Sequence, residues 1–186
     1  MTLMIDLRKE AEWERTREMA EKIAEFVPFS TDFERFLWLR RLPPKRIETI
    51  LESLGRIGKY RGWEFLLSGE ILTVTAREAL RLYREFLCSR YYDRLYPLLK
   101  ARFVRGKIPL EREFEGYLAN RKISPYRIRE FVRVLRRIAQ RSLSALLNAV
   151  GETASEREAL GYYRGFVCAT FKKSFEKWMK KDMRRG

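Results

Sequence analysis

The sequence FERFLWLRRLPPKRIETILESLGRI at residues 33–57 has a second version later in this 186-residue chain. Residues 114–138, FEGYLANRKISPYRIREFVRVLRRI, align with it without a gap and are identical at 10 of 25 positions. A further block, AREALRLYREFLC at 76–88, matches EREALGYYRGFVC at 156–168 at 8 of 13 positions. The offset is 81 residues in the first block and 80 in the second. The chain is therefore predicted to be a duplicated helical unit of about 70 to 80 residues that works as two related modules.

Both duplicated blocks carry apolar residues at helical spacing. In the first block the two stripes are Ile47, Ile50, Leu51, Leu54 and Ile57, and Ile128, Phe131, Val132, Leu135 and Ile138. In the second block they are Ala79, Leu80, Tyr83, Phe86 and Leu87, and Ala159, Leu160, Tyr163, Phe166 and Val167. Because the same helix faces are apolar in both copies, we expect each copy to bury them in a core.

Capping signals predict where the helices begin. Three hydroxyl residues precede a glutamate by three positions, the capping-box pattern, at Thr31, Thr75 and Ser155. Pro44 and Pro125 stand where a first helical turn accepts proline, and Ser124 supplies an N-cap oxygen before Pro125. We therefore expect three helices in each copy, with a variable connector that could hold a short fourth.

The N-terminal segment, roughly residues 5–26, has no counterpart in the second half. Its apolar residues lie near helical spacing and predict an amphipathic helix, which Val27-Pro28 ends: Leu7, Ala11, Met19, Ala20, Ile23 and Phe26. The one strand-like run, residues 71–74, is too short for a sheet. The predicted fold is all-α, with an N-terminal amphipathic helix at 1–30 and two tandem bundles of three to four helices at 31–107 and 108–186.

The charge of the chain lies in the repeats. Its 40 Lys and Arg and 25 Asp and Glu give a net charge of +15. Residues 1–31, 32–107 and 108–186 contribute −2, +8 and +9. An excess of this kind on the two repeats favours a polyanionic partner, although a solvated surface kept for solubility would have the same composition.

The rarer residues indicate the source and the compartment. Gln140 is the only glutamine, and Asn120 and Asn148 are the only asparagines, which is typical of thermophile proteins. Cys88 and Cys168 hold equivalent positions in the two copies, so we interpret them as small buried apolar residues; a bridge between the copies stays open. No apolar run reaches membrane-spanning length and the N-terminus is charged, so we expect a soluble cytoplasmic protein without membrane contact.

The strongest binding signal is a row of arginines opposite the apolar stripe of residues 125–141. They are spaced by four, three, one and four residues: Arg129, Arg133, Arg136, Arg137 and Arg141. Natural helices tolerate such mutual repulsion mostly where an anion neutralises it. The first copy has Glu48 and Glu52 at two of these positions. Its predicted contacts are therefore elsewhere, at Arg77, Arg81 and Arg84, and a basic C-terminal helix adds Lys172, Lys173, Lys177, Lys180 and Lys181.

The alternative for these cations is structural. The arginine row could pair with acids of another helix, as in thermophile ion-pair networks, and lysines near a helix C-terminus are favoured by the helix dipole alone. Basic residues present in both copies, such as Arg46 and Arg127, could pair with Glu34 and Glu115 or with Glu78 and Glu158.

No motif points to an enzyme. The chain has no histidine, so it lacks Ser-His and Cys-His nucleophile pairs and histidine-built metal sites. The run LGRIGK at 54–59 is similar to the glycine-rich turn of helix-hairpin-helix modules, but the second copy has no glycine there, which favours a helix C-cap. It also lacks the spacing of a nucleotide-binding phosphate loop. We therefore expect no catalytic residues, no metal and no cofactor.

The pattern Phe33, Phe36-Leu37, Arg40, Leu42, Pro44, Arg46, Ile47 and Leu54, followed by the block at 79–87, resembles the helical, SAM-like core-binding module of phage-integrase tyrosine recombinases. The second copy resembles it further, through Phe114, Tyr117-Leu118, Ile123-Ser124-Pro125, Ile128 and Leu135. The resemblance covers about residues 31–96 and 112–178 and implies a four-helix module that clamps duplex DNA. The family's catalytic domain, which needs histidine, has no counterpart here.

These observations predict a non-enzymatic nucleic-acid-binding protein. Its most favoured ligand is duplex DNA held through phosphates. The expected source is a thermophile, and the chain is expected to be an archaeal protein or a viral, plasmid or other mobile-element protein. The first alternative is an RNA-binding subunit of a ribonucleoprotein such as an RNA-guided defence complex. The second is a scaffold whose N-terminal helix recruits a protein partner.

Overall fold

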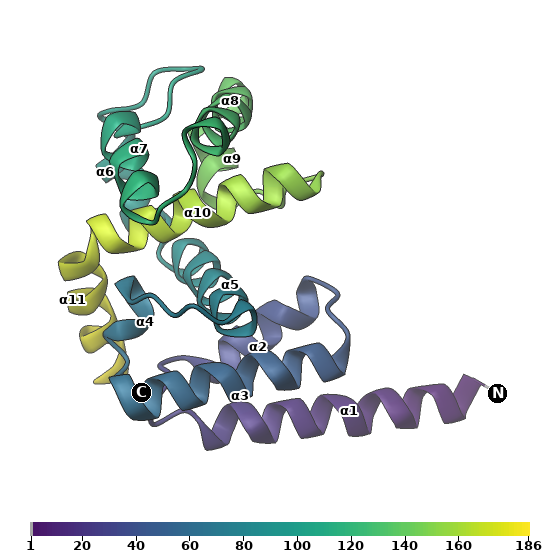
Figure 1. The fold of residues 1–186 in the computed structure, drawn as a ribbon. Coiled ribbons are helices and arrows are strands. Elements are labelled where there is room, and N and C mark those ends of the chain that lie inside the picture. Colours follow the sequence, from purple (N-terminus) through teal and green to yellow (C-terminus); the bar gives the residue numbers. More distant parts are fainter. Residues whose placement is uncertain (1) are drawn as a thin grey trace. The chain divides into compact units, whose positions relative to one another are not determined.

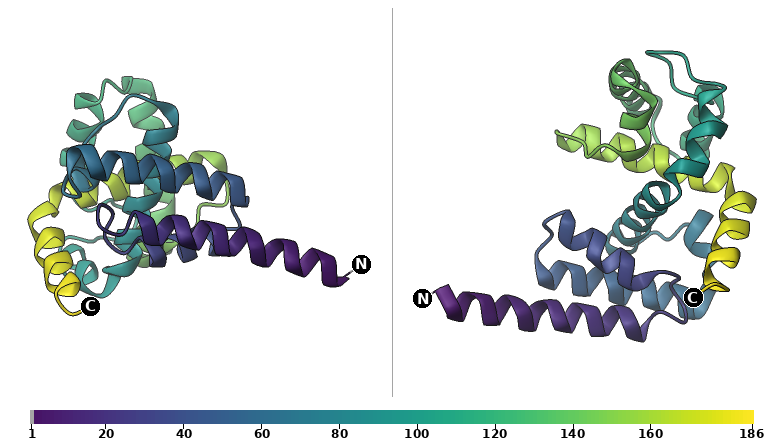
Figure 2. Two further views of the ribbon diagram at one scale, coloured as in Figure 1. Left: turned by 90° about the horizontal axis from the view of Figure 1, so that it is seen from below. Right: turned by 180° about the vertical axis from the view of Figure 1, so that it is seen from behind.

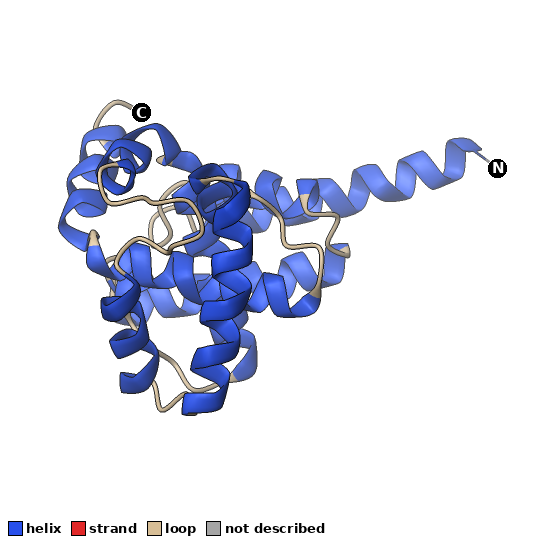
Figure 3. Cartoon of the chain, turned by 90° about the horizontal axis from the view of Figure 1, so that it is seen from above, coloured by secondary structure: helices blue, strands red, loops and turns tan. Residues whose placement is uncertain are grey.

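The computed structural model describes residues 2–186, with side chains from residue 8 onward. Within this part the chain forms helices and loops and no strand (Figure 3). The helices, labelled in Figure 1, are α1 (Thr2–Lys22), α2 (Ser30–Leu39), α3 (Pro44–Arg61), α4 (Phe65–Ser68), α5 (Val74–Arg90), α6 (Tyr92–Lys100), α7 (Glu111–Asn120), α8 (Pro125–Arg141), α9 (Leu143–Asn148), α10 (Ala154–Thr170) and α11 (Lys172–Met183). None of these described helices is long and apolar enough to cross a membrane.

The all-α fold is thus confirmed, with five helices in each copy where three to four were expected. The helix count differs because the last helix of each copy is interrupted. In the first copy α5 ends at Arg90 and α6 starts at Tyr92, and in the second α10 ends at Thr170 and α11 starts at Lys172.

The chain divides into two compact units that do not follow the predicted boundaries at 31–107 and 108–186. Unit 1 contains Met1–Tyr83 and Lys173–Gly186, and unit 2 contains Arg84–Lys172. Unit 1 therefore combines α1 to α4 and the start of α5 with α11 of the second copy. Unit 2 combines α7 to α10 with the end of α5 and with α6 of the first copy, which packs against α9. Each unit includes the final helix of the other copy.

Inside the units the two copies share their backbone details. Phe29 and Leu110, one residue before α2 and α7, are both left-handed at φ 59°. Arg41 and Lys122, after these helices, are left-handed at 56° and 57°. Four non-glycine residues with positive φ thus form two pairs at the repeat offset, so the duplication extends to strained turns that no helix pattern requires.

A buried tyrosine anchors the same turn in each copy. The Tyr83 hydroxyl donates to the Pro28 carbonyl at 2.8 Å, and the Tyr163 hydroxyl donates to the Pro109 carbonyl at 3.1 Å. Each ring meets a phenylalanine edge to face, with centroids 5.3 Å apart in the first copy and 5.4 Å apart in the second. Both rings are fully buried, so each hydroxyl needs this partner.

The predicted core positions are confirmed with one exception. Nineteen of the twenty stripe residues are buried, and Ile128 is half-buried because it lies in the first turn of α8. Pro44 and Pro125 are the first residues of α3 and α8, and the Ser124 hydroxyl accepts from the Arg127 amide at 3.4 Å, as expected.

The three predicted capping boxes are wrong. The N-cap of α2 is Phe29, without a side-chain bond, and α5 begins at Val74, before Thr75. The box of α10 lies two residues earlier than predicted. There the Thr153 hydroxyl accepts from the Glu156 amide at 3.1 Å, and the Glu156 carboxylate accepts from the Glu152 amide at 2.7 Å.

The glycines of LGRIGK lie inside α3 and form neither a C-cap nor a phosphate-binding turn. α3 continues to Arg61, and its C-cap is Gly62, with φ 84°. A Cβ on Gly55 would lie 2.5 Å from Ile23 Cγ2, and one on Gly58 would lie 2.4 Å from the Phe26 carbonyl oxygen. The two glycines therefore allow α1 and the turn after it to approach α3 closely.

α1 packs beside α2 and α3 (Figures 1 and 2) through fewer apolar residues than predicted. Ala20 is buried, but Ala11 is exposed and the Leu7 side chain lies outside the described ones. A polar cluster completes the contact. The buried Thr16 hydroxyl donates to the Glu34 carboxylate at 2.6 Å, and Trp38 Nε1 donates to the same carboxylate at 2.6 Å. Glu34 therefore holds α1 against α2, and it makes no ion pair with an arginine among the residues that the structure describes.

Candidate nucleic-acid interface

Helix α8 in unit 2 presents the predicted arginine row to solvent. Phe131, Val132, Leu135 and Ile138 bury one face of the helix, which turns the opposite face outward. All five arginines of the row are exposed. At 1.5 Å rise per residue the row is about 18 Å long.

Two of the five arginines are paired within the protein. Arg136 makes a two-pronged contact with Glu111 at the start of α7, with Nε donating to Oε2 at 3.1 Å and Nη2 donating to Oε1. This hydrogen-bonded carboxylate raises the pKa of Arg136. Arg141 lies 3.9 Å from Glu152 and 3.8 Å from Glu156. These two residues are held by acids of unit 2, as the structural alternative expected.

The other three form a single row without such partners. Arg129, Arg133 and Arg137 follow each other at intervals of four residues, about 6 Å along the axis. None of them makes a hydrogen bond or ion pair to any residue that the structure describes. We call these three residues the α8 triad. It is a surface of repelling guanidinium groups that is open to an anion.

The equivalent positions of α3 in the first copy carry no arginine row. Glu48, which corresponds to Arg129, contacts α1, and Gly55, which corresponds to Arg136, contacts Ile23 just after α1. Arg15 Nη1 lies 3.3 Å from Glu48 Oε1, and Ile23 lies against Gly55. Glu52, which corresponds to Arg133, pairs with Arg56 at 2.8 Å. At the triad positions α3 therefore has two acids and one arginine, and its exposed Arg56 is paired with Glu52, so the first copy has no unpaired arginine row there.

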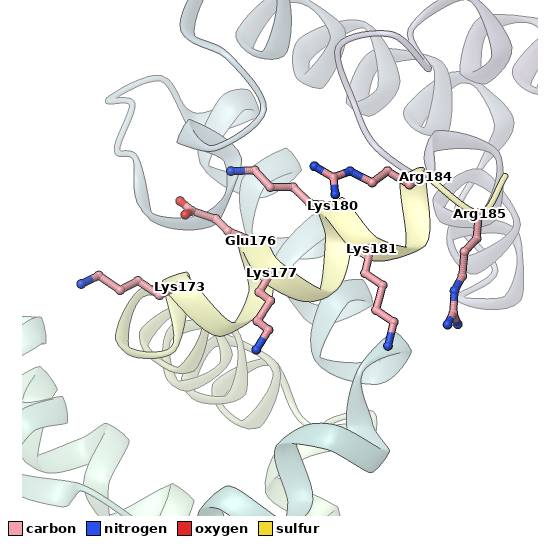
Figure 4. Close-up of a pocket in the computed structure, with 7 residues that line it drawn as sticks. All are labelled: Lys173, Glu176, Lys177, Lys180, Lys181, Arg184 and Arg185. Carbon is pink, nitrogen blue, oxygen red and sulfur yellow. The ribbon is translucent and has the colours of Figure 1, made fainter.

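A second cationic surface lies on α11 in unit 1. A hollow there is lined by six cations and one acid, and Figure 4 shows that Lys177, Lys181 and Arg185 extend along one side of the helix and Lys180 and Arg184 along the other. Lys180 Nζ is 5.8 Å from the centroid of the Trp63 ring, a cation–π contact. The predicted residues Lys173, Lys177, Lys180 and Lys181 are exposed on this surface, and Lys172 is half-buried.

The predicted group on α5 does not make a binding face. Arg84 is only 7 % exposed, so a phosphate cannot reach it. Arg81 lies 3.9 Å from Glu78, and the Arg77 Nε donates to the Ile71 carbonyl at 3.3 Å. We remove Arg84 from the candidate site, and the remaining two do not form a row comparable to the α8 triad.

Several arginines common to both copies have structural roles. Arg46 pairs with Glu78, and Arg127 pairs with Glu158 at 2.7 Å, which raises the pKa of Arg127. Arg164 is 1 % exposed, and its guanidinium donates to the carbonyls of Leu146 at 3.1 Å and Ala149 at 2.6 Å, at the end of α9. Arg46, Arg127 and Arg164, at positions that are arginine in both copies, are thus held by the fold, whereas Arg129 and Arg133 of the triad are glutamates in the first copy.

Sequence reasoning did not identify Tyr126. This residue is 70 % exposed in the first turn of α8, three residues before Arg129, and therefore lies on the exposed side of the helix. An exposed aromatic ring beside arginines can stack on a base or a sugar. Its signal in the sequence was a lone tyrosine after Pro125, on the polar side of the apolar stripe.

Among the described residues, no cluster of three or more Cys, Asp or Glu side chains is placed to hold a metal ion. Comparison with family models, with characterised proteins and with solved structures finds no match to this chain.

Proposed function

We propose that the chain is a nucleic-acid-binding protein that holds duplex DNA mainly through phosphate contacts. The observation that carries the proposal is the α8 triad, whose exposed arginines have no acidic partner in the described part of the chain. Guanidinium groups bind phosphate oxygens through paired hydrogen bonds, and a row of them matches a line of backbone charges. The α11 surface gives unit 1 a cationic contact of its own.

Duplex DNA is favoured over the alternatives by the resemblance of both copies to the core-binding module of tyrosine recombinases, which clamps a duplex. Phosphate contacts position a protein on the duplex and carry no base-sequence information. Binding should therefore show weak sequence preference.

The test is a set of binding isotherms for duplex DNA, single-stranded DNA and duplex RNA, each measured over a range of salt concentrations. For duplex DNA the logarithm of the association constant should fall with the logarithm of salt by about 0.9 for each phosphate contact. The variant R129A/R133A/R137A should lower this slope by about 2.7 and weaken binding at low salt. Tighter binding to duplex RNA would favour the ribonucleoprotein alternative instead.

A control with the same loss of charge separates the triad from net charge alone. R8A/R17A/R35A removes three exposed cations from α1 and α2 in unit 1. It should leave the salt slope nearly unchanged. Equal weakening by both triple variants, or no binding of any nucleic acid at low salt, would refute the assignment of the site.

A further inference from the structure

The two cysteines of the chain meet inside unit 2. Cys88 on α5 and Cys168 on α10 are both fully buried, and their Sγ atoms lie 3.8 Å apart. Each thiol is also 3.7 Å from a carbonyl oxygen one turn before the other cysteine. The Cys88 Sγ faces the Arg164 oxygen, and the Cys168 Sγ faces the Arg84 oxygen. The contact is reciprocal, as expected where equivalent positions of two copies face each other.

Packing alone does not require cysteine at these two positions, because other small apolar residues would fill the same space. The meeting of two sulfur atoms is therefore a separate feature of the pair. A disulfide needs its sulfurs at about 2.05 Å, so the observed pair must approach by about 1.8 Å to form one. The composition of the chain is that of a thermophile protein, the class in which intracellular disulfides are common.

We propose that Cys88 and Cys168 form an intramolecular disulfide when the chain meets a low-molecular-weight disulfide oxidant. In the first step the thiolate of one cysteine attacks the oxidant, which releases one small thiol and leaves a mixed disulfide. In the second step the other cysteine attacks the protein sulfur of that mixed disulfide and releases the second small thiol. The two cysteines lose two electrons and two protons in total, and the oxidant is reduced to two thiols. This inference is independent of the proposed function.

The surroundings decide when this exchange takes place. Burial is the main factor that raises the pKa of Cys168 well above its ordinary value, and the nearby Cys88 raises it further. Since the thiolate is the attacking species, exchange in the closed unit is slow. The bond should therefore form while unit 2 folds or opens, and once formed it should be protected from added reductant until the protein is unfolded.

The bond would close a loop of about 80 residues. A loop of this size loses much of its freedom in the unfolded chain, so we expect the oxidised protein to melt about 10 °C higher than the reduced protein.

The experiment compares reduced protein with protein refolded in oxidised glutathione. Both samples are unfolded, treated with iodoacetamide and weighed by mass spectrometry. The proposal expects an oxidised chain that is lighter by two hydrogen atoms, carries no alkyl group, and melts higher until it is reduced in denaturant. The variants C88A and C168A should each take up one glutathione or one alkyl group and lose the oxidant-dependent shift.

The wild-type measurement stands even if a variant fails to fold. Two alkylated cysteines after refolding in oxidant, two glutathione adducts, or a disulfide-linked dimer in place of the internal bond would each overturn the proposal.

Discussion

Reversing one charge in the middle of the α8 triad should make the protein more stable and a poorer binder. In R133E the new carboxylate stands four residues from Arg129 and from Arg137. Two repulsive pairs, each unfavourable by about 0.2–0.5 kcal/mol, become two attractive pairs of similar size. Arginine and glutamate have similar helix propensities, so the change in pairing dominates. The expected gain is about 0.8–2 kcal/mol in the free energy of unfolding, or about 2–8 °C in melting temperature.

The first copy already contains one of these two pairs. Glu52 holds the equivalent position of α3 and pairs with Arg56, the equivalent of Arg137, at 2.8 Å. R133E therefore gives α8 the Glu–Arg pair that α3 has, while the pair with Arg129 has no counterpart because position 48 is Glu. The gain should shrink at 1 M salt, where the screening length of about 3 Å is shorter than the spacing of about 6 Å between the charges.

The assay pairs thermal melts at low and high salt with duplex DNA binding at low salt. R133E should weaken binding about tenfold or more, because it removes a cation and places an anion against the phosphates. R35E, the same charge change at an exposed position of α2, should leave the affinity close to that of the wild type. A lower melting temperature for R133E at low salt would show that Arg133 has a structural partner, and unchanged DNA affinity would remove it from the binding surface.

Two further predictions concern the fold. G55A places a Cβ 2.5 Å from Ile23 Cγ2, so it should lower the free energy of unfolding by about 1–3 kcal/mol in a denaturant melt. Its control G116A, in α7 with open space around the added Cβ, should raise it by about 0.5–1 kcal/mol, and equal effects would contradict the close contact with α1. Burial raises the pKa of Tyr163 far above 10, so its contribution to stability is complete below about pH 10. Above that pH the Tyr163 hydroxyl should lower the free energy of unfolding by up to about 1.4 kcal/mol per pH unit. The Y163F variant should show a smaller slope in denaturant melts measured above about pH 10. An equal slope in wild type and Y163F would show that the Tyr163 hydroxyl is solvated.

The sequence alone was sufficient to predict the features that the two copies share. Core stripes such as Ile47 to Ile57 and Phe131 to Ile138 follow from periodicity, since a helix with one apolar face must bury it. Ser124-Pro125 identifies a helix start through chemistry confined to two residues. Each of these predictions depends on neighbours along the chain, and that is why they are confirmed.

Predictions failed where a distant segment competes with a local motif. Glu34 follows Thr31 at capping-box spacing, but α1 brings Thr16 to the same carboxylate, and the helix starts elsewhere. Gly55 and Gly58 resemble a turn in sequence, and only the position of Ile23 and Phe26 shows that they make room for α1. The pairing of Arg136 with Glu111 joins residues 25 positions apart, and no local pattern separates Arg136 from the unpaired triad.

The two copies agree in their cores and differ on one face, and this difference bears on where a ligand lies. An arginine at position 55, the equivalent of Arg136, would begin with the same Cβ that collides with Ile23, so α3 cannot carry an arginine at this one position of the row. On α8 the equivalent surface is exposed, and the side chains there are arginines. At the triad positions the copies differ in charge, since Glu48 and Glu52 stand on α3 where α8 has Arg129 and Arg133. On the proposed function, the polyanion contact of unit 1 therefore lies on α11, because two of its three triad positions are acidic.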